Sequence, residues 1–128
     1  MNFVLSQRFF FDAAHTLQRE IGDEGSRRIH GHTYHAQIFV RGTLDSETGM
    51  VLDLGHFNHA IERVREQLDH RFLDEIQELG PATLENLCVF IWRKVAELIP
   101  DVTRVRVERT AGGDACDVFL DGEHMPLE

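Results

Sequence analysis

Two early stretches of the chain are typical of strands, the first by its residue types and the second by its alternation of hydrophobic and polar positions. Residues 3–13, FVLSQRFFFDA, are rich in β-branched and aromatic residues and predict a first strand. Residues 30–44 predict a second strand, and the polar residues 16–29 between them predict a long loop. Five residues of the second strand share one face: His32, Tyr34, Ala36, Ile38 and Val40.

Farther along the chain the hydrophobic period changes to that of a helix. Asp53 stands at the start of the first helical stretch and Thr83 at the start of the second, each suited to cap a helix. Pro100 ends the second stretch. The apolar stripes comprise Leu54, Phe57, Ile61, Val64 and Leu68 in the first helix, and Leu84, Leu87, Ile91, Val95 and Leu98 in the second.

The last third of the chain returns to strand-like alternation. Residues 102–110 predict a third strand, residues 111–114 a turn, and residues 115–122 a fourth strand. The order ββααββ predicts an α+β fold, in which a four-stranded antiparallel sheet carries two helices on one face. The 128 residues, without repeats or linkers, indicate one domain over 1–128. Such a sheet leaves two edges that oligomerisation would cover.

Composition narrows the classes of partner. The net charge of −9 argues against nucleic acid, because binding phosphates along a backbone needs clustered Lys and Arg. An anionic substrate is not excluded, since the local charge at a pocket can oppose the net charge. The chain shows no signal-peptide pattern and no apolar stretch long enough to span a membrane. We therefore expect a cytoplasmic protein without a membrane partner, with Cys88 and Cys116 reduced.

Three histidines form the main candidate for chemistry. His30 and His32 project from the same face of the second strand, and His15 follows the first strand, which can pair with it. Three imidazoles with an open fourth position are typical of a catalytic Zn²⁺ site. The alternative is a chance pair whose histidines bond only to the backbone. For the histidines without convergent partners we expect surface or structural roles: His35, His56, His59 and His124.

Several motifs in order resemble one family over nearly the whole chain. They are FDAAH, HGHTYH, LDLGHFN, LDHRFLD, PATLENLCVFIW and VRVERT. This set is similar to the 6-pyruvoyltetrahydropterin synthase family, and most to its bacterial 6-carboxytetrahydropterin synthase branch of queuosine biosynthesis. The resemblance implies the tunnelling fold and a homohexamer built as a dimer of trimers, with pockets at the interfaces between subunits. It also implies that His15, His30 and His32 bind the zinc.

The resemblance assigns further site residues. Asp69 and His70 match the catalytic Asp-His dyad, and Glu108 matches the glutamate that anchors the pterin. Thr83 matches a position that contacts the pterin. Each has a structural alternative: a salt bridge at the end of a helix for Asp69, a surface position for Glu108, and a helix cap for Thr83. Arg27 or Arg28, beside the metal ligands, is a candidate for binding the substrate's triphosphate, or else a solvated charge.

The implied activity is a zinc-dependent lyase reaction on a small pterin. It converts 7,8-dihydroneopterin triphosphate to 6-carboxy-5,6,7,8-tetrahydropterin, with acetaldehyde and triphosphate released. The proton-abstracting cysteine of the bacterial branch is replaced by Ser26, whose hydroxyl is a far poorer base than a thiolate. Glu24 stands at the spacing of the animal branch's cysteine and is an alternative base, whereas Cys88 fits the core better.

Three functions remain open at this stage. The first is a tetrahydropterin-forming lyase in which Ser26 is tolerated or is an engineered change. The second is a variant that cleaves the neopterin side chain like an aldolase. The third is a zinc-containing pterin-binding protein without turnover.

Overall fold

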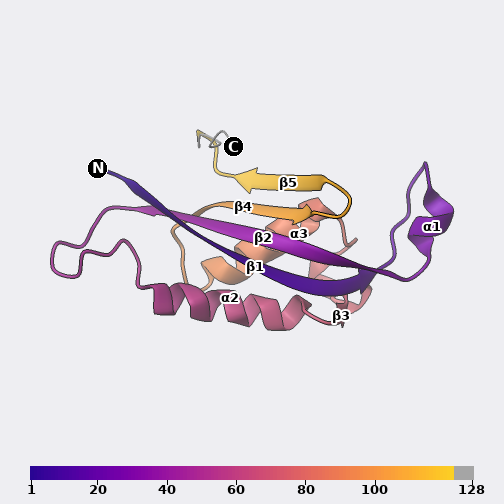
Figure 1. The fold of residues 1–128 in the computed structure, drawn as a ribbon, viewed down its shortest axis with the longest axis horizontal. Coiled ribbons are helices and arrows are strands. Elements are labelled where there is room, and N and C mark those ends of the chain that lie inside the picture. Colours follow the sequence, from indigo (N-terminus) through magenta and orange to yellow (C-terminus); the bar gives the residue numbers. More distant parts are fainter. Residues whose placement is uncertain (123–128) are drawn as a thin grey trace.

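A long, twisted sheet forms one layer of the molecule, and helices α2 and α3 cover one of its faces (Figure 1). The structure is a computed structural model that describes residues 1–122. The last six residues of the expected domain over 1–128, His124 among them, lie outside the described residues. The elements are β1 (Phe3–His15), α1 (Asp23–Arg27), β2 (His30–Gly42), α2 (Leu54–Leu68), β3 (Arg71–Phe72), the 3₁₀ turns η1 (Leu73–Glu75) and η2 (Gln77–Leu79), α3 (Leu84–Ala96), β4 (Val102–Arg109) and β5 (Asp114–Phe119).

The sheet has five strands in the order β3-β1-β2-β4-β5. The four longer strands pair antiparallel, as the sequence pattern predicts, but β3 pairs parallel to β1 through Ala13 and Ala14. The prediction of a four-stranded, purely antiparallel sheet is therefore wrong: the sheet has a fifth strand, and that strand is parallel to its neighbour. A strand of two residues is too short to show a period, and a hydrogen bond from the His70 amide to the Asp12 carbonyl (2.6 Å) holds the chain beside β1 at this point.

The expectation of two helices is also incomplete, because the stretch 16–29 contains α1. This five-residue helix begins after Gly22, which has a φ of 72°, and buries none of its residues. The ion pairs Asp23–Arg27 and Glu24–Arg28 join its side chains one turn apart. A hydrophobic period could not reveal such a helix, because no apolar face is present. In Figure 1, α1 lies at one end of the molecule, away from α2 and α3.

The two long helices begin where their capping residues predict. The Asp53 carboxylate accepts a hydrogen bond from the Gly55 amide (2.7 Å), and the Thr83 hydroxyl accepts one from the Asn86 amide (3.1 Å). Most of the predicted apolar stripe of each helix is buried against the sheet. Leu54 and Leu98 are exceptions, being about half exposed, because Leu54 starts α2 and Leu98 lies beyond the end of α3.

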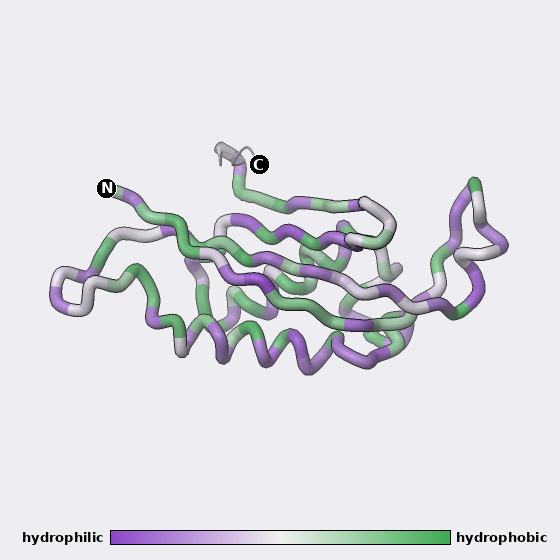
Figure 2. Tube along the Cα trace, in the orientation of Figure 1, coloured by the Kyte–Doolittle hydropathy of each residue, from purple (hydrophilic) through white to green (hydrophobic). Residues whose placement is uncertain are grey.

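The core fills the space between the sheet and the two helices. Alternate residues of the two long strands are buried there, among them Phe11 and Ala13 of β1 and Tyr34, Ala36 and Ile38 of β2. Figure 2 shows hydrophobic residues recurring along α2 and α3 as well as along the strands. The ring of Phe11 stacks on that of Tyr34 from the neighbouring strand, with centroids 5.0 Å apart. The largest fully buried side chains are those of Tyr34, Phe11, Phe57, Ile38, Leu68, Leu73, Leu87 and Ile91.

Both edges of the sheet leave a strand open within residues 1–122. On one side β3 covers only two positions of β1, so its earlier part has β2 as its sole partner. On the other side β5 pairs with β4 alone. Among these residues, no helix combines the length and the apolar character that crossing a membrane requires.

Candidate metal centre

The three candidate histidines converge at one end of the β1–β2 pair. His15 and His30 are direct partners in the register, and His32 follows two residues later on the same face. The ring centroids are 4.6 to 4.9 Å apart, and one ligating nitrogen from each ring lies within 4.8 Å of the others. Pairing of the two strands thus brings together the imidazoles that the sequence pattern singles out.

Backbone carbonyls determine which nitrogen two of these rings present. His15 Nδ1 lies 3.0 Å from the Ala82 carbonyl oxygen, and His30 Nδ1 lies 2.7 Å from that of Arg28. A carbonyl oxygen only accepts hydrogen bonds, so each Nδ1 carries the proton and each Nε2 keeps its lone pair. This is the tautomer that a metal ligand needs.

The donor set fits Zn²⁺. Tetrahedral coordination with Zn–N bonds of about 2.0 to 2.1 Å separates ligand nitrogens by roughly 3.3 Å, and the Nε2 atoms of His15 and His32 are 3.1 Å apart. Burial, together with the nearby charge of Arg109, lowers the pKa of His32 to about 4. Burial also lowers the pKa of His15. Both rings are therefore neutral near pH 7, as metal binding requires.

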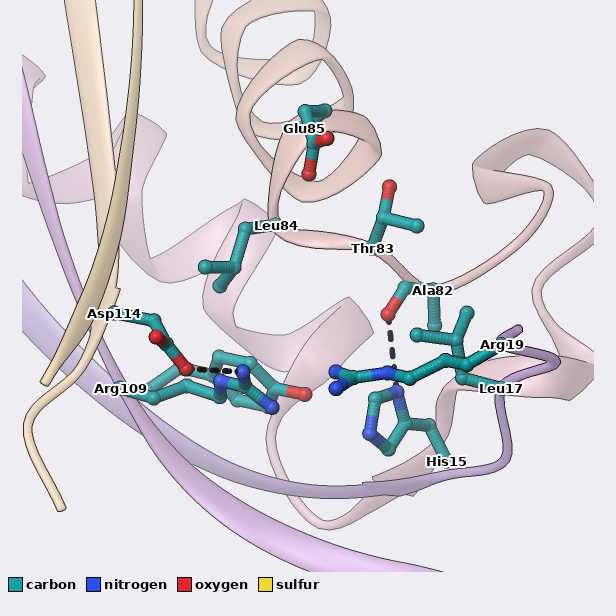
Figure 3. Close-up of a pocket in the computed structure, with 10 residues that line it drawn as sticks. His15, Leu17, Arg19, Ala82, Thr83, Leu84, Glu85, Arg109 and Asp114 are labelled. Atoms are coloured by element: carbon teal, nitrogen blue, oxygen red, sulfur yellow. Dashed lines mark hydrogen bonds and ion pairs between the residues drawn. The ribbon is translucent and has the colours of Figure 1, made fainter. Parts of the chain in front are cut away.

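A pocket of about 400 Å³ opens beside His15 (Figure 3). Arg19 from the loop after β1 and Arg109 from the end of β4 extend into it from two sides. Arg109 contacts His32 Nε2 through Nη1 (3.3 Å) and pairs with the Asp114 carboxylate through Nη2. The lining residues are His15, Leu17, Arg19, Tyr34, Ala82, Thr83, Leu84, Glu85, Arg109 and Asp114.

The predicted dyad lies directly after α2. Asp69 accepts a hydrogen bond from His70 Nδ1 (2.9 Å) through one carboxylate oxygen and one from the Asp12 amide (3.0 Å) through the other. These bonds, the Asp12 amide first and then His70, lower the pKa of Asp69, and the charge of Arg65 adds to them. His70 has a φ of 58°, a conformation that residues other than glycine adopt rarely and at some energetic cost.

The dyad and the histidine cluster meet at His32. A second pocket, of about 560 Å³, is lined by His70 and His32 together with Asp12, Ala13, Ala14, Gly31, Thr33, Arg71 and Phe72. The side chain of His70 is 79% exposed and is free to approach a ligand or another subunit. The structure therefore places His70 and the candidate ligand His32 around one pocket, which shares no lining residue with the Arg109 pocket.

Other predicted site residues lie outside both pockets in this single chain. Ser26 is half-buried in α1, and its carbonyl accepts a hydrogen bond from the Leu17 amide. Glu24 and Arg28 form an exposed ion pair with each other. Glu108 is on the sheet face away from α2 and α3, 4.0 Å from Arg106. Within residues 1–122, the side chains of these residues therefore do not join the histidine cluster in either pocket.

Thr83 caps α3, which confirms the structural alternative, and it also lines the first pocket, while its contact with a pterin stays a prediction. Sequence reasoning did not single out Arg19, Glu85 or Arg109 as pocket residues. One signal was present for Arg109: it shares the core-facing positions of β4 with Val105 and Val107. An arginine on an otherwise apolar face needs a partner or a function.

The fold is that of a tetrahydropterin synthase. The *Caenorhabditis elegans* 6-pyruvoyl tetrahydropterin synthase structure superimposes with a TM-score of 0.80 at 23% identity, covering 94% of this chain and 97% of that one. The 6-pyruvoyl tetrahydropterin synthase family model matches residues 4–116. This chain belongs to that family.

Curated relatives carry three related pterin activities in their names. A *Drosophila melanogaster* 6-pyruvoyl tetrahydrobiopterin synthase is 37% identical over 105 residues, 71% of this chain and 62% of that protein. A *Synechocystis* 6-carboxy-5,6,7,8-tetrahydropterin synthase is 33% identical, covering 84% of this chain and 86% of that protein. A *Pyrococcus furiosus* dihydroneopterin monophosphate aldolase is 32% identical, with 84% and 88% covered. The chain thus has pterin synthases and a pterin aldolase among its relatives.

Proposed function

We propose that this protein is a zinc-dependent lyase of queuosine biosynthesis. It converts 7,8-dihydroneopterin triphosphate and one water molecule to 6-carboxy-5,6,7,8-tetrahydropterin, acetaldehyde and triphosphate. The observation that carries the proposal is the convergence of three imidazoles, two of them held by backbone carbonyls in the metal-binding tautomer, beside a pocket in a chain of this family. The *Synechocystis* relative supports this choice of product.

The zinc would be held by His15, His30 and His32, and would supply a Lewis acid for the hydroxyls of the substrate side chain. His70 is the proposed general acid or base, since its Nε2 is free while Asp69 holds Nδ1. Asp69 orients this ring and stabilises its protonated form. Glu108 is the proposed pterin anchor, because one carboxylate can accept two parallel N–H donors from the pterin ring, and Thr83 is a second contact.

Assembly is part of the proposal. Ser26, His70 and Glu108 do not share a pocket in one chain. A homohexamer, in which trimers form through the open sheet edges and two trimers stack, would place residues of neighbouring subunits around each histidine cluster. The Arg28–Glu24 ion pair is exposed and could also meet a substrate bound by the neighbouring subunit.

A second candidate is aldolase-like cleavage of the neopterin side chain. Two observations favour it: the *Pyrococcus furiosus* aldolase relative, and the serine at position 26 where the lyase branch has its cysteine. Glu24 would then be the base. A zinc- and pterin-binding protein without turnover is the remaining alternative.

Product analysis distinguishes these functions. The zinc-loaded protein is incubated with 7,8-dihydroneopterin triphosphate, and the pterins and aldehydes are separated and identified. The proposal predicts 6-carboxytetrahydropterin and acetaldehyde. A hydroxymethylpterin would instead establish the aldolase reaction. Unchanged substrate would favour the third alternative, a zinc- and pterin-binding protein without turnover.

The role of position 26 is tested by restoring the thiol. Ser26→Cys should raise tetrahydropterin formation by roughly a hundred- to ten-thousand-fold, the usual contribution of a general base. Ser6→Cys, on the exposed face of β1, is the matched control and should change nothing. If Ser26→Cys brings no gain in protein that retains its zinc, the serine belongs to different chemistry, and Glu24→Gln should then abolish the original reaction.

A further inference from the structure

Arg109 is an arginine with unused hydrogen-bond donors inside a pocket. Its side chain is 15% exposed, and its Nε is buried without a hydrogen-bond partner in the described part of the chain. Nη2 pairs with Asp114, and Nη1 contacts His32. A guanidinium has five N–H donors in a fixed planar fork. Arg109 therefore has donors to spare beside the candidate metal ligands.

Arg19 brings a second positive charge to the same pocket. The loop that carries it is anchored through its backbone, because the Arg19 amide donates to the Asp23 carboxylate (2.8 Å). Within residues 1–122 no carboxylate pairs with the Arg19 guanidinium. Figure 3 shows the two guanidinium groups extending toward each other across the pocket. Glu85 and Asp114, which pairs with Arg109, also line this pocket, so an anion between the two guanidinium groups would compete with these carboxylates. The convergence of two cations is the feature that favours an anion here, despite the net charge of −9.

In the free protein, the Asp114 carboxylate occupies the place on the Arg109 guanidinium that a bound anion would take. Its carboxylate is 52% exposed, so water competes for it, while the Arg109 side chain that it pairs with is mostly buried. An incoming phosphate could replace it on the guanidinium without leaving Asp114 buried and unpaired. Arginine forks match phosphate oxygens in two-pronged geometry.

The arginines expected from the sequence have no comparable position. Arg27 pairs with Asp23 (2.7 Å), and Arg28 pairs with Glu24 (2.9 Å). Both are largely exposed, Arg27 in the last turn of α1 and Arg28 directly after it. Their charges are balanced locally, whereas the Arg19 charge is not.

We propose that Arg19 and Arg109 form the site that holds the phosphate chain of the substrate, beside the histidine cluster. This inference rests on the proposed function for the identity of the substrate. In the free protein Asp114 forms an ion pair with Arg109, and this ion pair breaks when the phosphate chain binds to Arg109.

The test measures binding of inorganic tripolyphosphate by isothermal titration calorimetry, in chelator-treated and in zinc-loaded protein. Arg109→Ala and Arg19→Ala should each weaken binding at least tenfold in both forms, and Asp114→Asn should strengthen it several-fold. Arg28→Ala tests the sequence-based candidate, and Arg63→Ala, an exposed arginine of α2 paired with Glu97, is the matched control. The Arg63→Ala control should bind as the wild type does, and a loss of binding confined to Arg28→Ala would move the phosphate site to the end of α1.

Failure of this inference differs from failure of the proposed function, because binding requires no turnover. Wild-type affinity in both Arg109→Ala and Arg19→Ala, or no binding by the wild type in either form, would overturn the phosphate site. The Arg19→Ala variant, in an exposed loop, keeps the test valid if Arg109→Ala fails to fold. Weakened binding in a protein that yields no pterin product would uphold the site while the lyase activity fails.

Discussion

At the scale of single residues, two backbone carbonyl oxygens determine the tautomers of His15 and His30. His30 and His32 alternate along one strand, so their common face follows from the sequence. The bond from His15 to the Ala82 carbonyl does not, because these residues are 67 positions apart. The ligand types could therefore be predicted, while the tautomers needed the folded chain.

Two carboxylates compete for the role of pterin anchor. Glu85 lines the pocket beside His15, whereas Glu108 lies on the other face of the sheet and outside that pocket. If Glu108 is the anchor, Glu108→Gln should weaken binding of a pterin such as 6-carboxypterin by tenfold or more, and Glu85→Gln by less. Fluorescence titration measures both affinities. The reverse order would move the anchor to Glu85.

The two cysteines should be inert in the folded protein. Burial raises the pKa of the Cys88 thiol and also that of Cys116, and Cys88 Sγ donates to the Cys116 carbonyl (3.3 Å). Raised pKa values leave little thiolate at pH 8, the form that reacts. Iodoacetamide followed by mass spectrometry should show labelling of both only in denaturant. Rapid labelling of Cys88 at native conditions would contradict its place in the core.

At the scale of elements, the sequence predicts what hydrophobic period and capping control. The starts of α2 and α3 follow from Asp53 and Thr83, β2 and β4 follow from alternation, and β1 follows from its β-branched and aromatic residues. The sequence pattern does not predict β3 or α1, because these elements depend on single hydrogen bonds and local ion pairs rather than on an apolar face. The pairing of Arg109 with Asp114 across the β4–β5 turn also needs the register.

The end of α2 offers a test of the dyad as a structural unit. Asp69→Asn should lower the free energy of unfolding at pH 7 by about 1 to 2 kcal/mol, because hydrogen bonds to a charged carboxylate are lost. A lowered pKa means that this stabilisation is present above the ordinary pKa of an aspartate and disappears as the pH falls below the folded-state value.

Urea unfolding at pH 7 and at pH 3 measures both effects. The difference between the wild type and Asp69→Asn should shrink at pH 3, while Asp101→Asn, at an exposed position, should match the wild type at both pH values. An equal difference at the two pH values would show that the carboxylate charge does not contribute.

At the scale of the whole molecule, both open edges of the sheet carry exposed apolar side chains. Phe3, Val4 and Phe10 lie on β1, and Phe119 ends β5. Unpaired edges with such residues favour pairing between copies. The barrel of the tunnelling fold would join β1 of one chain to β5 of the next, and trimers would stack into the proposed hexamer.

A charge at this edge should prevent assembly. Phe119→Lys should shift the mass measured by light scattering at micromolar concentration from a trimer or hexamer toward a monomer. Leu44→Lys, a similarly exposed residue in a loop, should leave the mass unchanged. A monomeric mass for the wild type would contradict the proposed hexamer.

The central claim is that three imidazoles of two paired strands hold one zinc ion. Elemental analysis of purified, dialysed protein tests it most directly, comparing the wild type with His30→Ala, His32→Ala and the control His56→Ala on the exposed face of α2. We predict about one zinc per chain in the wild type and the control, and a small residual fraction in the two ligand variants. Unchanged metal content in both ligand variants, or a wild type that takes up no zinc, would contradict the assignment.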